Sequence, residues 1–306
     1  MIEVKQFVPL APLTTFQIGG DAEYFVEVKT EDELREAIRF ARDKHISFTI
    51  LSGGSNMLLP DNGVKGLVIH FRSGDFSFAG TELAADAGCD LLALIQAASV
   101  KGLGGWEKLS GIPGSVGGAV RGNAGAFGSE IKDFVVLVRA LDSNGGDIRE
   151  FQGGECDFSY RHSFFKDNSI WVITRVFLDL QKIDSTESVK ISEETIAERE
   201  KRHLQNVKAA GSFFMNPVVP SGIVEMFEKE KGVKSRENRV PAGWLIEKAG
   251  MKGSAVGGAQ ASLQHPNYIV NTGNATAQNV RTLAENIKIA VKSMFGVHLQ
   301  EEAMVL

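Results

Sequence analysis

Cysteine is scarce in this chain of 306 residues, which contains only Cys89 and Cys156, without C-x-x-C spacing. Two such cysteines cannot build a disulfide framework, so we expect two free thiols in a reducing cytoplasm. The six histidines show no ligand spacing, and neither an H-E-x-x-H motif nor a Cys/His cluster is present. We therefore expect no metal site and no zinc chemistry.

Long hydrophobic runs and an excess of basic charge are also missing. No segment approaches the roughly 20 apolar residues of a membrane helix. The N-terminus, Met-Ile-Glu-Val-Lys-Gln, has no basic stretch followed by an apolar core, so we expect no signal peptide. A net charge of −5 gives no general attraction for nucleic acid or anionic membrane. We expect a cytoplasmic monomer that acts on small molecules, with neither nucleic acid nor membrane as a partner.

Three well-known loop motifs are absent, and each absence excludes a class of enzyme. The sequence has no G-x-x-x-x-G-K-[ST] motif, which argues against a P-loop NTPase. It has no G-x-G-x-x-G fingerprint, which argues against an ordinary Rossmann dehydrogenase. It also has no G-x-S-x-G elbow, which argues against an α/β-hydrolase.

Glycine, by contrast, is abundant, with 33 residues that cluster at 53–54, 102–128 and 250–258. They alternate with apolar residues, which indicates closely packed backbone rather than a linker. Gly53-Gly54-Ser55-Asn56 and the segment 111–118 combine glycine with small hydroxyl residues, as a site for a pyrophosphate requires. The same two segments also fit tight turns and close helix packing, so this pattern alone leaves both interpretations open.

The first part of the chain predicts a small α/β unit. Strands are expected at 24–28, 48–51 and 66–71, with a helix from Thr30 whose Glu33 completes a capping box. This β-α-β order favours a parallel pair of strands. Gly53 and Gly54 then follow the second strand at its carboxyl end, where α/β sheets place ligands.

The rest of the chain predicts mixed elements in two parts. We expect a helix capped by Asp90, a hairpin at 134–141 and 147–151, and a strand at 169–178. A domain boundary is expected around 182–205, within a charged stretch where Ser192 caps a helix that ends near His203. Beyond it we expect helices at 241–249 and after Thr276, the second with an apolar stripe that includes Met294, and a strand at 297–302.

Three side chains in the second half could carry chemistry. Arg161 could stabilise developing negative charge, although a lone arginine also fits a surface ion pair. Ser212, between glycine and two phenylalanines, could pass a proton, although a lone serine also fits a turn. Glu302 could orient a substrate, with Glu301 as a competing candidate and a solvated tail charge as the simpler interpretation.

Taken in order, the motifs resemble the UDP-N-acetylenolpyruvoylglucosamine reductase family of bacterial peptidoglycan synthesis. The resemblance covers nearly the whole chain through the segments Thr14–Gly20, Leu51–Leu58, Leu109–Ala119, Asn123–Gly128, Tyr160–Ser163, Gly211–Pro217, Pro241–Glu247, Ala249–Gly253 and Phe295–Glu302. The chain has no tyrosine between Tyr160 and Ser212, and so it is similar to the second subtype, which lacks a tyrosine-bearing loop.

This resemblance implies an α+β fold, with a two-part FAD-binding domain of the vanillyl-alcohol-oxidase type followed by an α/β substrate domain. The FAD-binding domain would span 1–183, in subdomains of about 1–70 and 71–183, and the substrate domain 184–306, with Glu302 on its C-terminal strand. It also implies non-covalent FAD, with NADPH as hydride source. The enolpyruvyl ether of UDP-N-acetylglucosamine would be reduced to UDP-N-acetylmuramate.

The resemblance further implies roles for individual residues. Arg161 and Glu302 would stabilise the enol-like intermediate, and Ser212 would donate the proton. Tyr160, Asn216 and His265 would bind the substrate, and Asn123, Ala124 and Gly125 would lie against the flavin. The FAD phosphates and their surroundings would be held by Leu51, Ser52, Gly53, Gly54, Ser55, Asn56, Gly111, Ile112, Gly114, Ser115, Gly117 and Gly118.

Three departures from the family pattern concern the substrate side. The family usually has lysine where Met215 stands and arginine where Met304 stands, and a proline-rich stretch is replaced around Arg202. Lys208 and Arg202 are candidate replacements for the lost cations. Two alternatives to the reductase remain open: a flavoprotein oxidase or dehydrogenase of the same fold acting on another substrate, and a non-catalytic flavin or nucleotide-sugar binding protein.

Overall fold

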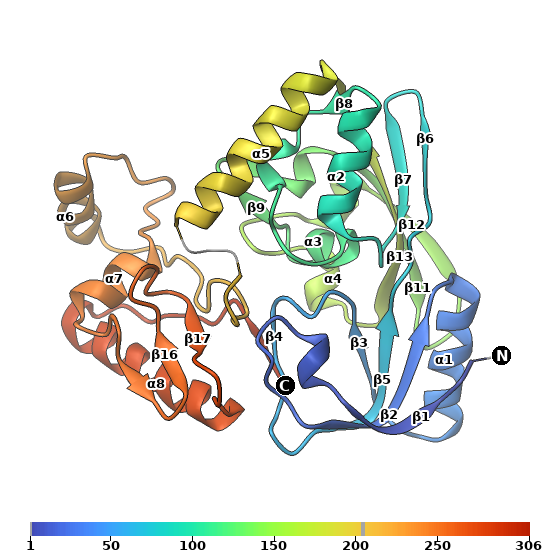
Figure 1. Cartoon of the computed structure of the whole chain (residues 1–306), viewed down its shortest axis with the longest axis horizontal. Coiled ribbons are helices and arrows are strands. Elements are labelled where there is room, and N and C mark those ends of the chain that lie inside the picture. The colour runs from blue at the N-terminus through green and yellow to red at the C-terminus, as the bar shows by residue number, and fades with distance from the viewer. Residues whose placement is uncertain (1, 203–205) are drawn as a thin grey trace. The chain divides into compact units, whose positions relative to one another are not determined.

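The structure, a computed structural model, describes residues 2–202 and 206–306 (Figure 1). Its residues form two compact units. The first comprises Met1–Val8, Ala22–Gly54 and Val64–Lys201, and the second comprises Pro9–Asp21, Ser55–Gly63 and Arg202–Leu306. This division differs from the expected boundary at 183/184, because residues 184–201 pack with the first unit and two N-terminal segments pack with the second.

A four-stranded sheet opens the first unit, in the order β1 (Lys5–Pro9), β2 (Asp21–Val28), β5 (Val64–Phe71) and β3 (Phe48–Leu51). Both β2 and β3 run parallel to β5, which lies between them, so the predicted parallel pairing is confirmed with β5 as the partner of each. Helix α1 (Glu31–Asp43) buries the apolar stripe Leu34, Ala37, Ile38 and Ala41. The capping box is only half formed, because Thr30 accepts from the Glu33 N–H but the Glu33 carboxylate accepts from the Lys29 N–H instead.

The remainder of the first unit is built on a five-stranded antiparallel sheet. Its order is β12 (Ile148–Gln152), β11 (Val135–Asp142), β13 (Trp171–Asp179), β7 (Glu82–Asp86) and β6 (Phe76–Ala79). The predicted hairpin is therefore confirmed, and Asp90 caps α2 (Leu91–Val100) as expected. The unit's shorter elements are β8 (Leu103–Gly104), η2 (Glu107–Leu109), α3 (Val116–Arg121), β9 (Gly125–Ala126), β10 (Ser129–Glu130), η3 (Ile131–Asp133), η4 (Gly153–Cys156), α4 (Phe164–Asp167) and β14 (Gln181–Lys182).

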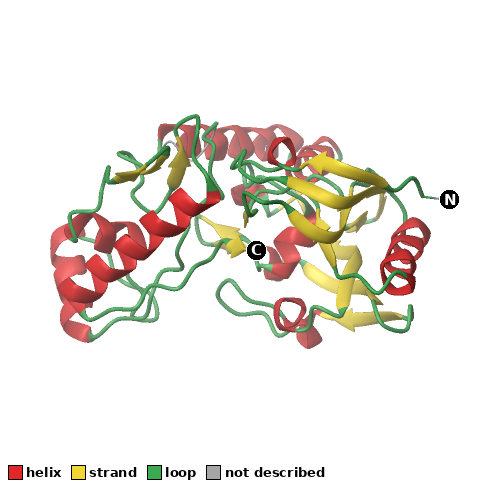
Figure 2. Cartoon of the chain, turned by 90° about the horizontal axis from the view of Figure 1, so that it is seen from below, coloured by secondary structure: helices red, strands yellow, loops and turns green. Residues whose placement is uncertain are grey.

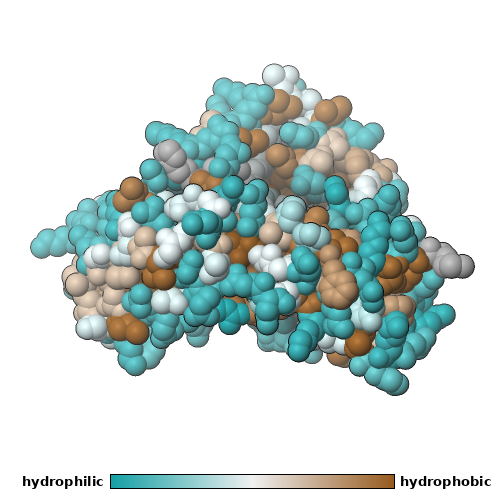
Figure 3. Space-filling model, turned by 60° about the horizontal axis from the view of Figure 1, so that its bottom comes forward, coloured by the Kyte–Doolittle hydropathy of each residue, from teal (hydrophilic) through white to brown (hydrophobic). Residues whose placement is uncertain are grey.

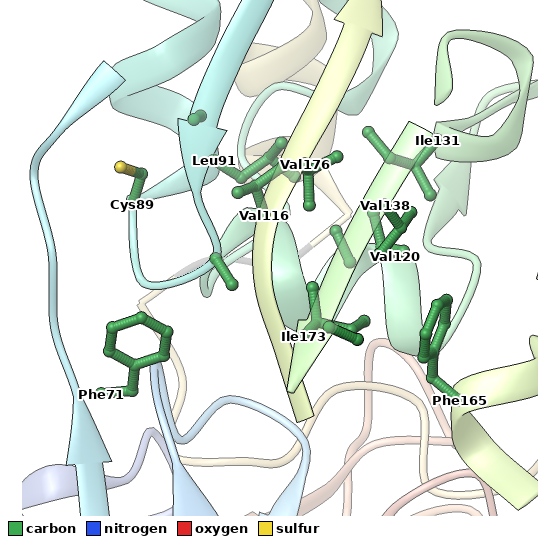
Figure 4. Close-up of a cluster of buried hydrophobic side chains, with 14 of the residues drawn as sticks. Phe71, Cys89, Leu91, Val116, Val120, Ile131, Val138, Phe165, Ile173 and Val176 are labelled. Atoms are coloured by element: carbon green, nitrogen blue, oxygen red, sulfur yellow. The ribbon is translucent and has the colours of Figure 1, made fainter. Parts of the chain in front are cut away.

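Apolar side chains from α3 and this sheet form the core of the first unit (Figure 4). Figure 4 shows Val116 and Val120 of α3 beside Val138, Ile173 and Val176 of the strands. All five are buried. The core thereby fixes α3, whose first residues belong to the glycine-rich segment 111–118.

Helix α5 (Ser185–Lys201) corrects one prediction. It begins earlier than expected, after Asp184, whose carboxylate accepts from the Glu187 N–H at 3.0 Å. Ser192 therefore lies inside the helix and is buried instead of capping it. The predicted end near His203 lies outside the described residues. Small polar side chains on the buried face explain the error, because they resemble a helix start in sequence; Ser188, for example, donates to the Glu107 carboxylate at 2.6 Å.

The second unit combines a small antiparallel sheet with three helices. The sheet has the order β15 (Ala255–Val256), β16 (Ala259–Ala261) and β17 (Ile269–Asn271). The helices are α6 (Ser221–Lys231), α7 (Ala242–Lys248) and α8 (Ala277–Phe295), and a 3₁₀ helix, η1 (Ala11–Leu13), belongs to this unit as well. In Figure 2 the strands of the first unit gather into its sheets, whereas the second unit is mostly helix and loop.

Two predictions for the end of the chain need correction. Thr276 caps α8 as expected, but Met294 is 58% exposed, and Phe295 instead packs its ring 5.9 Å from that of Trp244. Residues 297–302 form no strand beyond an isolated bridge between Phe214 and Glu301. The strand comes later, as β18 (Met304–Val305) parallel to β4 (Met57–Leu58), and Glu302 precedes it.

No helix within the described parts of the chain combines the length and apolar character that crossing a membrane demands. On the face shown in Figure 3, hydrophobic residues are scattered among hydrophilic ones. Such scattered apolar residues are ordinary on a protein surface.

Candidate functional site

The loop after β3 meets the second glycine segment inside the first unit. Leu51 ends the strand in the core, and the Ser52 hydroxyl donates to the Phe71 carbonyl at 3.0 Å. A Cβ on Gly53 would lie 2.4 Å from the Gly114 Cα, so only glycine fits there. The two glycine segments, separated by more than 50 residues in sequence, are therefore in direct backbone contact, as a shared binding site requires.

The segment 111–118 turns sharply before α3. Gly111 and Gly114 have φ angles of +76° and +115°, which side chains other than glycine rarely adopt. The Gly114 carbonyl accepts from the Leu91 N–H at 3.0 Å. Ser115 caps α3 by accepting from the Gly118 N–H at 3.2 Å. Glycine and a cap residue thus have local structural roles in this segment.

Hydrogen bonding narrows the set of groups that could bind a phosphate. The N–H groups of Ile112, Gly117 and Gly118 already donate to Leu109, Ala87 and Ser115. Gly117 also packs tightly, because a Cβ there would lie 2.5 Å from that of Ala87. Across residues 2–202 and 206–306, no hydrogen bond uses the N–H groups of Gly53, Gly54, Gly114 or Ser115. These four are the candidate phosphate donors, and the ligand contacts of both segments stay a prediction.

Asn123 is the first residue of the next segment, Asn123–Gly128, and is fully buried. Its side-chain NH₂ donates to the Glu130 carboxylate at 3.1 Å and to the Ser159 carbonyl at 2.8 Å. Its side-chain oxygen accepts from the Lys132 N–H at 3.3 Å. Ala124 and Gly125 continue into a short hairpin through β9 and β10. The Asn123 amide therefore organises this loop, and its predicted contact with a flavin stays a prediction.

Arg161 lies beside the same loop of the first unit. Its guanidinium donates to the Gly125 carbonyl at 3.0 Å and to the Asn123 carbonyl at 3.5 Å. It also lies over the ring of Tyr160, with 5.3 Å between the guanidinium carbon and the ring centre. The backbone of Arg161 has a φ of +57°, which costs about 1–3 kcal/mol for a residue with a side chain.

The second unit brings Ser212 and Glu302 into neighbouring segments. The carbonyl of Phe213 accepts from the Glu302 N–H at 2.8 Å, and that of Gln300 accepts from the Met215 N–H at 2.9 Å. Ser212 is half-buried, and none of the hydrogen bonds among the described residues uses its hydroxyl. That hydroxyl is consequently available to a ligand.

Asn56 has a role that sequence reasoning missed. Although it belongs to the predicted phosphate loop, it lies in the second unit, where its side-chain amide donates to the Glu302 carbonyl at 3.1 Å. Its own carbonyl accepts from the Met304 N–H at 2.9 Å. Asn56 thus fixes the backbone of a predicted catalytic residue. The two residues are 246 positions apart, so no local signal could have revealed this contact.

The structure also separates the two competing glutamates. The Glu301 carboxylate forms an ion pair with Lys288 of α8, at 2.7 Å. This ion pair gives Glu301 a structural role, and the catalytic role of Glu302 stays a prediction.

The predicted substrate residues have varied surroundings. Tyr160 belongs to the first unit, beside Arg161. The Asn216 side chain accepts from the Ala242 N–H at 3.0 Å, at the start of α7. Burial lowers the pKa of His265, whose ring centre lies 4.8 Å from that of Tyr268. A further residue that sequence reasoning missed is Asn267, which exchanges hydrogen bonds of 2.8 and 3.0 Å with the backbone of Phe214, close to Ser212.

The residues of the first unit fit FAD. Its two glycine loops are in contact, glycine is sterically required at the contact, and four neighbouring backbone N–H groups are left for phosphate oxygens. In contrast, the part of the chain that is described has no group of three or more His, Cys, Asp or Glu side chains placed to hold a metal ion.

Comparisons with known proteins agree with these observations. Residues 22–152 match the family model of a FAD binding domain, and residues 202–306 match that of UDP-N-acetylenolpyruvoylglucosamine reductase, C-terminal domain. The chain thus has the predicted succession of a FAD-binding domain and a substrate domain.

Individual relatives match along most of their length. The reductase of Solibacter usitatus is 35% identical over 312 residues, which cover 98% of this chain and 96% of that protein. The reductase of Heliobacterium modesticaldum is 37% identical over 300 residues, covering 97% and 89%. The crystal structure of the Thermus caldophilus enzyme superimposes with a TM-score of 0.76 at 31% identity, over 100% of this chain and 98% of that one. The chain is a member of the UDP-N-acetylenolpyruvoylglucosamine reductase family.

Proposed function

We propose that this chain uses FAD and NADPH to reduce the enolpyruvyl ether of UDP-N-acetylglucosamine to UDP-N-acetylmuramate, a step of peptidoglycan precursor synthesis. The observation that carries the proposal is the pairing of the Ser212 segment with the Glu302 segment through backbone hydrogen bonds. Among the described residues, no hydrogen bond uses the Ser212 hydroxyl. Family membership over the full length supports the choice of substrate.

The glycine loops of the first unit would hold the cofactor. The N–H groups of Gly53, Gly54, Gly114 and Ser115 would donate to its phosphate oxygens. When bound, FAD supplies the hydride that it has taken from NADPH. The protein supplies binding, orientation and charge.

Arg161, Glu302 and Ser212 would act on the substrate. Hydride addition at the vinyl terminus leaves negative charge on the adjacent carbon and its carboxylate, and the fixed charge of Arg161 would stabilise it. Ser212 would then give its hydroxyl proton to that carbon. A serine hydroxyl is a weak acid, so this transfer requires a strongly basic carbon nearby. Glu302 would hold the substrate in place and keep a proton available for the transfer.

We further propose a cytoplasmic location, which the two thiols support. Burial raises the pKa of the Cys89 thiol to about 11 and that of the Cys156 thiol to about 12. Both are free cysteines. Buried free thiols support a reducing compartment, and we place the reaction in the cytoplasm.

Turnover with the authentic sugar nucleotide is the decisive experiment. NADPH oxidation by the purified, FAD-loaded protein is expected to depend on the enolpyruvyl compound. Steady oxidation of NADPH with oxygen alone would instead favour an oxidase. A protein that binds FAD but oxidises NADPH with neither the enolpyruvyl compound nor oxygen would favour the non-catalytic binding protein. Met215 and Met304 give a reason for that outcome, because they stand where the family usually has two cations.

Replacing Ser212 by alanine tests the assigned proton donor. We expect Ser212→Ala to leave flavin reduction by NADPH nearly intact and to slow the reaction with the enolpyruvyl substrate by about 10²–10⁴-fold. Rapid mixing separates the two half-reactions through the flavin absorbance. Ser221→Ala, at an exposed serine of α6, is the matched control. Equal rates in Ser212→Ala and Ser221→Ala would show that another group donates the proton.

A further inference from the structure

The backbone of Glu130, in the first unit, is fixed by residues that follow it in the chain. Ile131, which follows it, is fully buried and lies close to Val120 and Val138 (Figure 4). The Ile131 N–H donates to the Ala124 carbonyl at 2.9 Å. The Glu130 N–H donates to the Asp133 carboxylate at 2.9 Å. The position of Glu130 is therefore set by the core and by a local cap.

The Glu130 carboxylate contacts two partners. It accepts from the Asn123 amide at 3.1 Å and forms an ion pair with Lys132 at 2.6 Å. The Glu130 side chain is 26% exposed, whereas Asn123 is fully buried. A charge-assisted hydrogen bond to a buried amide is stronger than one between neutral groups.

Both NH₂ hydrogens of the Asn123 side-chain amide are used. One hydrogen is donated to the Glu130 carboxylate and the other to the Ser159 carbonyl, while the side-chain oxygen accepts from the backbone N–H of Lys132. An amide in this state can neither rotate nor flip without losing a buried hydrogen bond. Glu130 thus selects the orientation in which Asn123 binds Ser159.

Ser159 begins the tight turn that presents Arg161. Its N–H and carbonyl pair with those of His162, at 3.2 and 3.1 Å. Arg161 lies inside this turn and has a strained φ of +57°. Its guanidinium donates hydrogen bonds to the carbonyls of Asn123 and Gly125. The contacts form a closed ring from Glu130 through Asn123 and Ser159 to Arg161 and back to the loop.

We propose that Glu130 is a positioning residue for the reduction: through the Asn123 amide it holds the Ser159–His162 turn, and with it the guanidinium of Arg161, in the orientation that stabilises negative charge on the substrate. This inference rests on the proposed function. A strained turn needs such external support, because an unsupported backbone would relax to a negative φ and move the guanidinium.

Half-reaction kinetics of Glu130 variants test this proposal. We expect Glu130→Ala to slow the reaction with the enolpyruvyl substrate by about 10- to 100-fold while flavin reduction by NADPH changes less than about threefold. Glu130→Gln keeps an acceptor for Asn123 and should recover most of the rate. Glu150→Ala removes an exposed glutamate of the same unit and serves as the control. Should Glu130→Ala fail to fold, Glu130→Asp, whose acceptor is withdrawn by one methylene, should also be slow.

The Arg161 guanidinium provides a readout that does not depend on turnover. Its NMR signals, assigned with Arg161→Lys, should move in Glu130→Ala and keep their wild-type positions in Glu130→Gln and Glu150→Ala. Slow substrate reduction together with displaced Arg161 signals supports the proposal. Unchanged signals overturn it, as does equal slowing of both half-reactions or a Glu130→Asp variant with the wild-type rate. A wild-type protein without substrate turnover overturns the proposed function, and the Arg161 signals then decide the positioning role alone.

Discussion

Glycine is required at position 53 because the Gly114 Cα lies where a side chain would begin. The motif predicted a phosphate cradle at this place, and the structure adds the steric reason for the residue type. At Gly117 the reason is different, because the obstacle is Ala87 and the N–H is already used. Residues of one motif therefore divide into donors for a ligand and glycines for packing.

His70 of β5 is a buried titratable residue that the proposed chemistry does not use. It pairs in register with Glu27 on one side and Leu51 on the other, just below the first glycine loop. Burial lowers its pKa from 6.5, against the opposing effect of Glu27 at 3.5 Å, and Arg72 lowers it further. His70 is thus neutral in the folded protein at pH 7.

The lowered pKa of His70 predicts how stability depends on pH. Below 6.5 the unfolded chain takes up a proton before the folded protein does, so the free energy of unfolding falls as pH falls toward the folded pKa. His70→Gln should flatten this dependence between about pH 7 and pH 5, measured by denaturant unfolding at several pH values. His298→Gln, at an exposed histidine, should leave the dependence as in the wild type. Identical curves for His70→Gln and wild type would contradict the prediction.

The candidate catalytic residues were predictable only as members of motifs. Arg161, Ser212 and Glu302 were named from their order in the chain, and the structure adds the positive φ at Arg161 and the ion pair between Glu301 and Lys288. Their supports Asn267 and Glu130 were not predicted, because an isolated asparagine or glutamate carries no pattern.

Among the elements, α8 shows how a distant segment completes a helix. Thr276 caps it locally by accepting from the Asn279 N–H at 3.1 Å. Asp61, from the segment 55–63 of the same unit, accepts from the N–H groups of Ala277 and Gln278 at 2.7 and 3.1 Å. The carboxylate satisfies two donors of the first turn and places negative charge at the positive end of the helix.

Removal of the Asp61 carboxylate should weaken the second unit. We expect Asp61→Ala to lower the free energy of unfolding by about 1–2 kcal/mol, because two helix N–H groups lose their acceptor. Asp61→Asn keeps an acceptor without the charge and should lose less. Chemical denaturation of the three proteins measures the difference, and equal stability of Asp61→Ala and wild type would show that water replaces the carboxylate without cost.

Elements with a regular pattern of apolar residues were predicted correctly, whereas the start of α5 and the terminal strand were not. The parallel strands around α1 and the hairpin of β11 and β12 follow from alternation and turn residues. The start of α5 was misplaced, because serine on a buried face looks like a cap in the sequence. The terminal strand was placed several residues too early, since the strand partner that defines it, β4, lies far away in the chain.

For the molecule as a whole, FAD binding should raise stability by mass action. At free FAD of about 100 times its dissociation constant, the free energy of unfolding should rise by ~2.7 kcal/mol. Thermal unfolding with and without FAD measures this effect. FMN, which lacks the pyrophosphate-linked adenosine, should stabilise less, and Gly53→Ala should abolish the gain, because its methyl group would enter the backbone of Gly114. A full FAD effect in Gly53→Ala would place the cofactor elsewhere.

Local order along the chain was sufficient to predict the parallel strands at 24–28, 48–51 and 66–71, the hairpin, most helices, the cofactor class and the family, because periodicity, caps and motif spacing are read along the sequence. The tertiary structure was needed to find which backbone N–H groups remain for a phosphate, why Asn56 serves Glu302, and how Glu130 reaches Arg161 through Asn123. Most of these contacts join residues far apart in sequence. The Glu130–Asn123 hydrogen bond spans only seven positions, and its role depends on Asn123 binding Ser159, 36 positions away. Their existence depends on how whole elements pack, and packing assigns each buried donor and acceptor its partner.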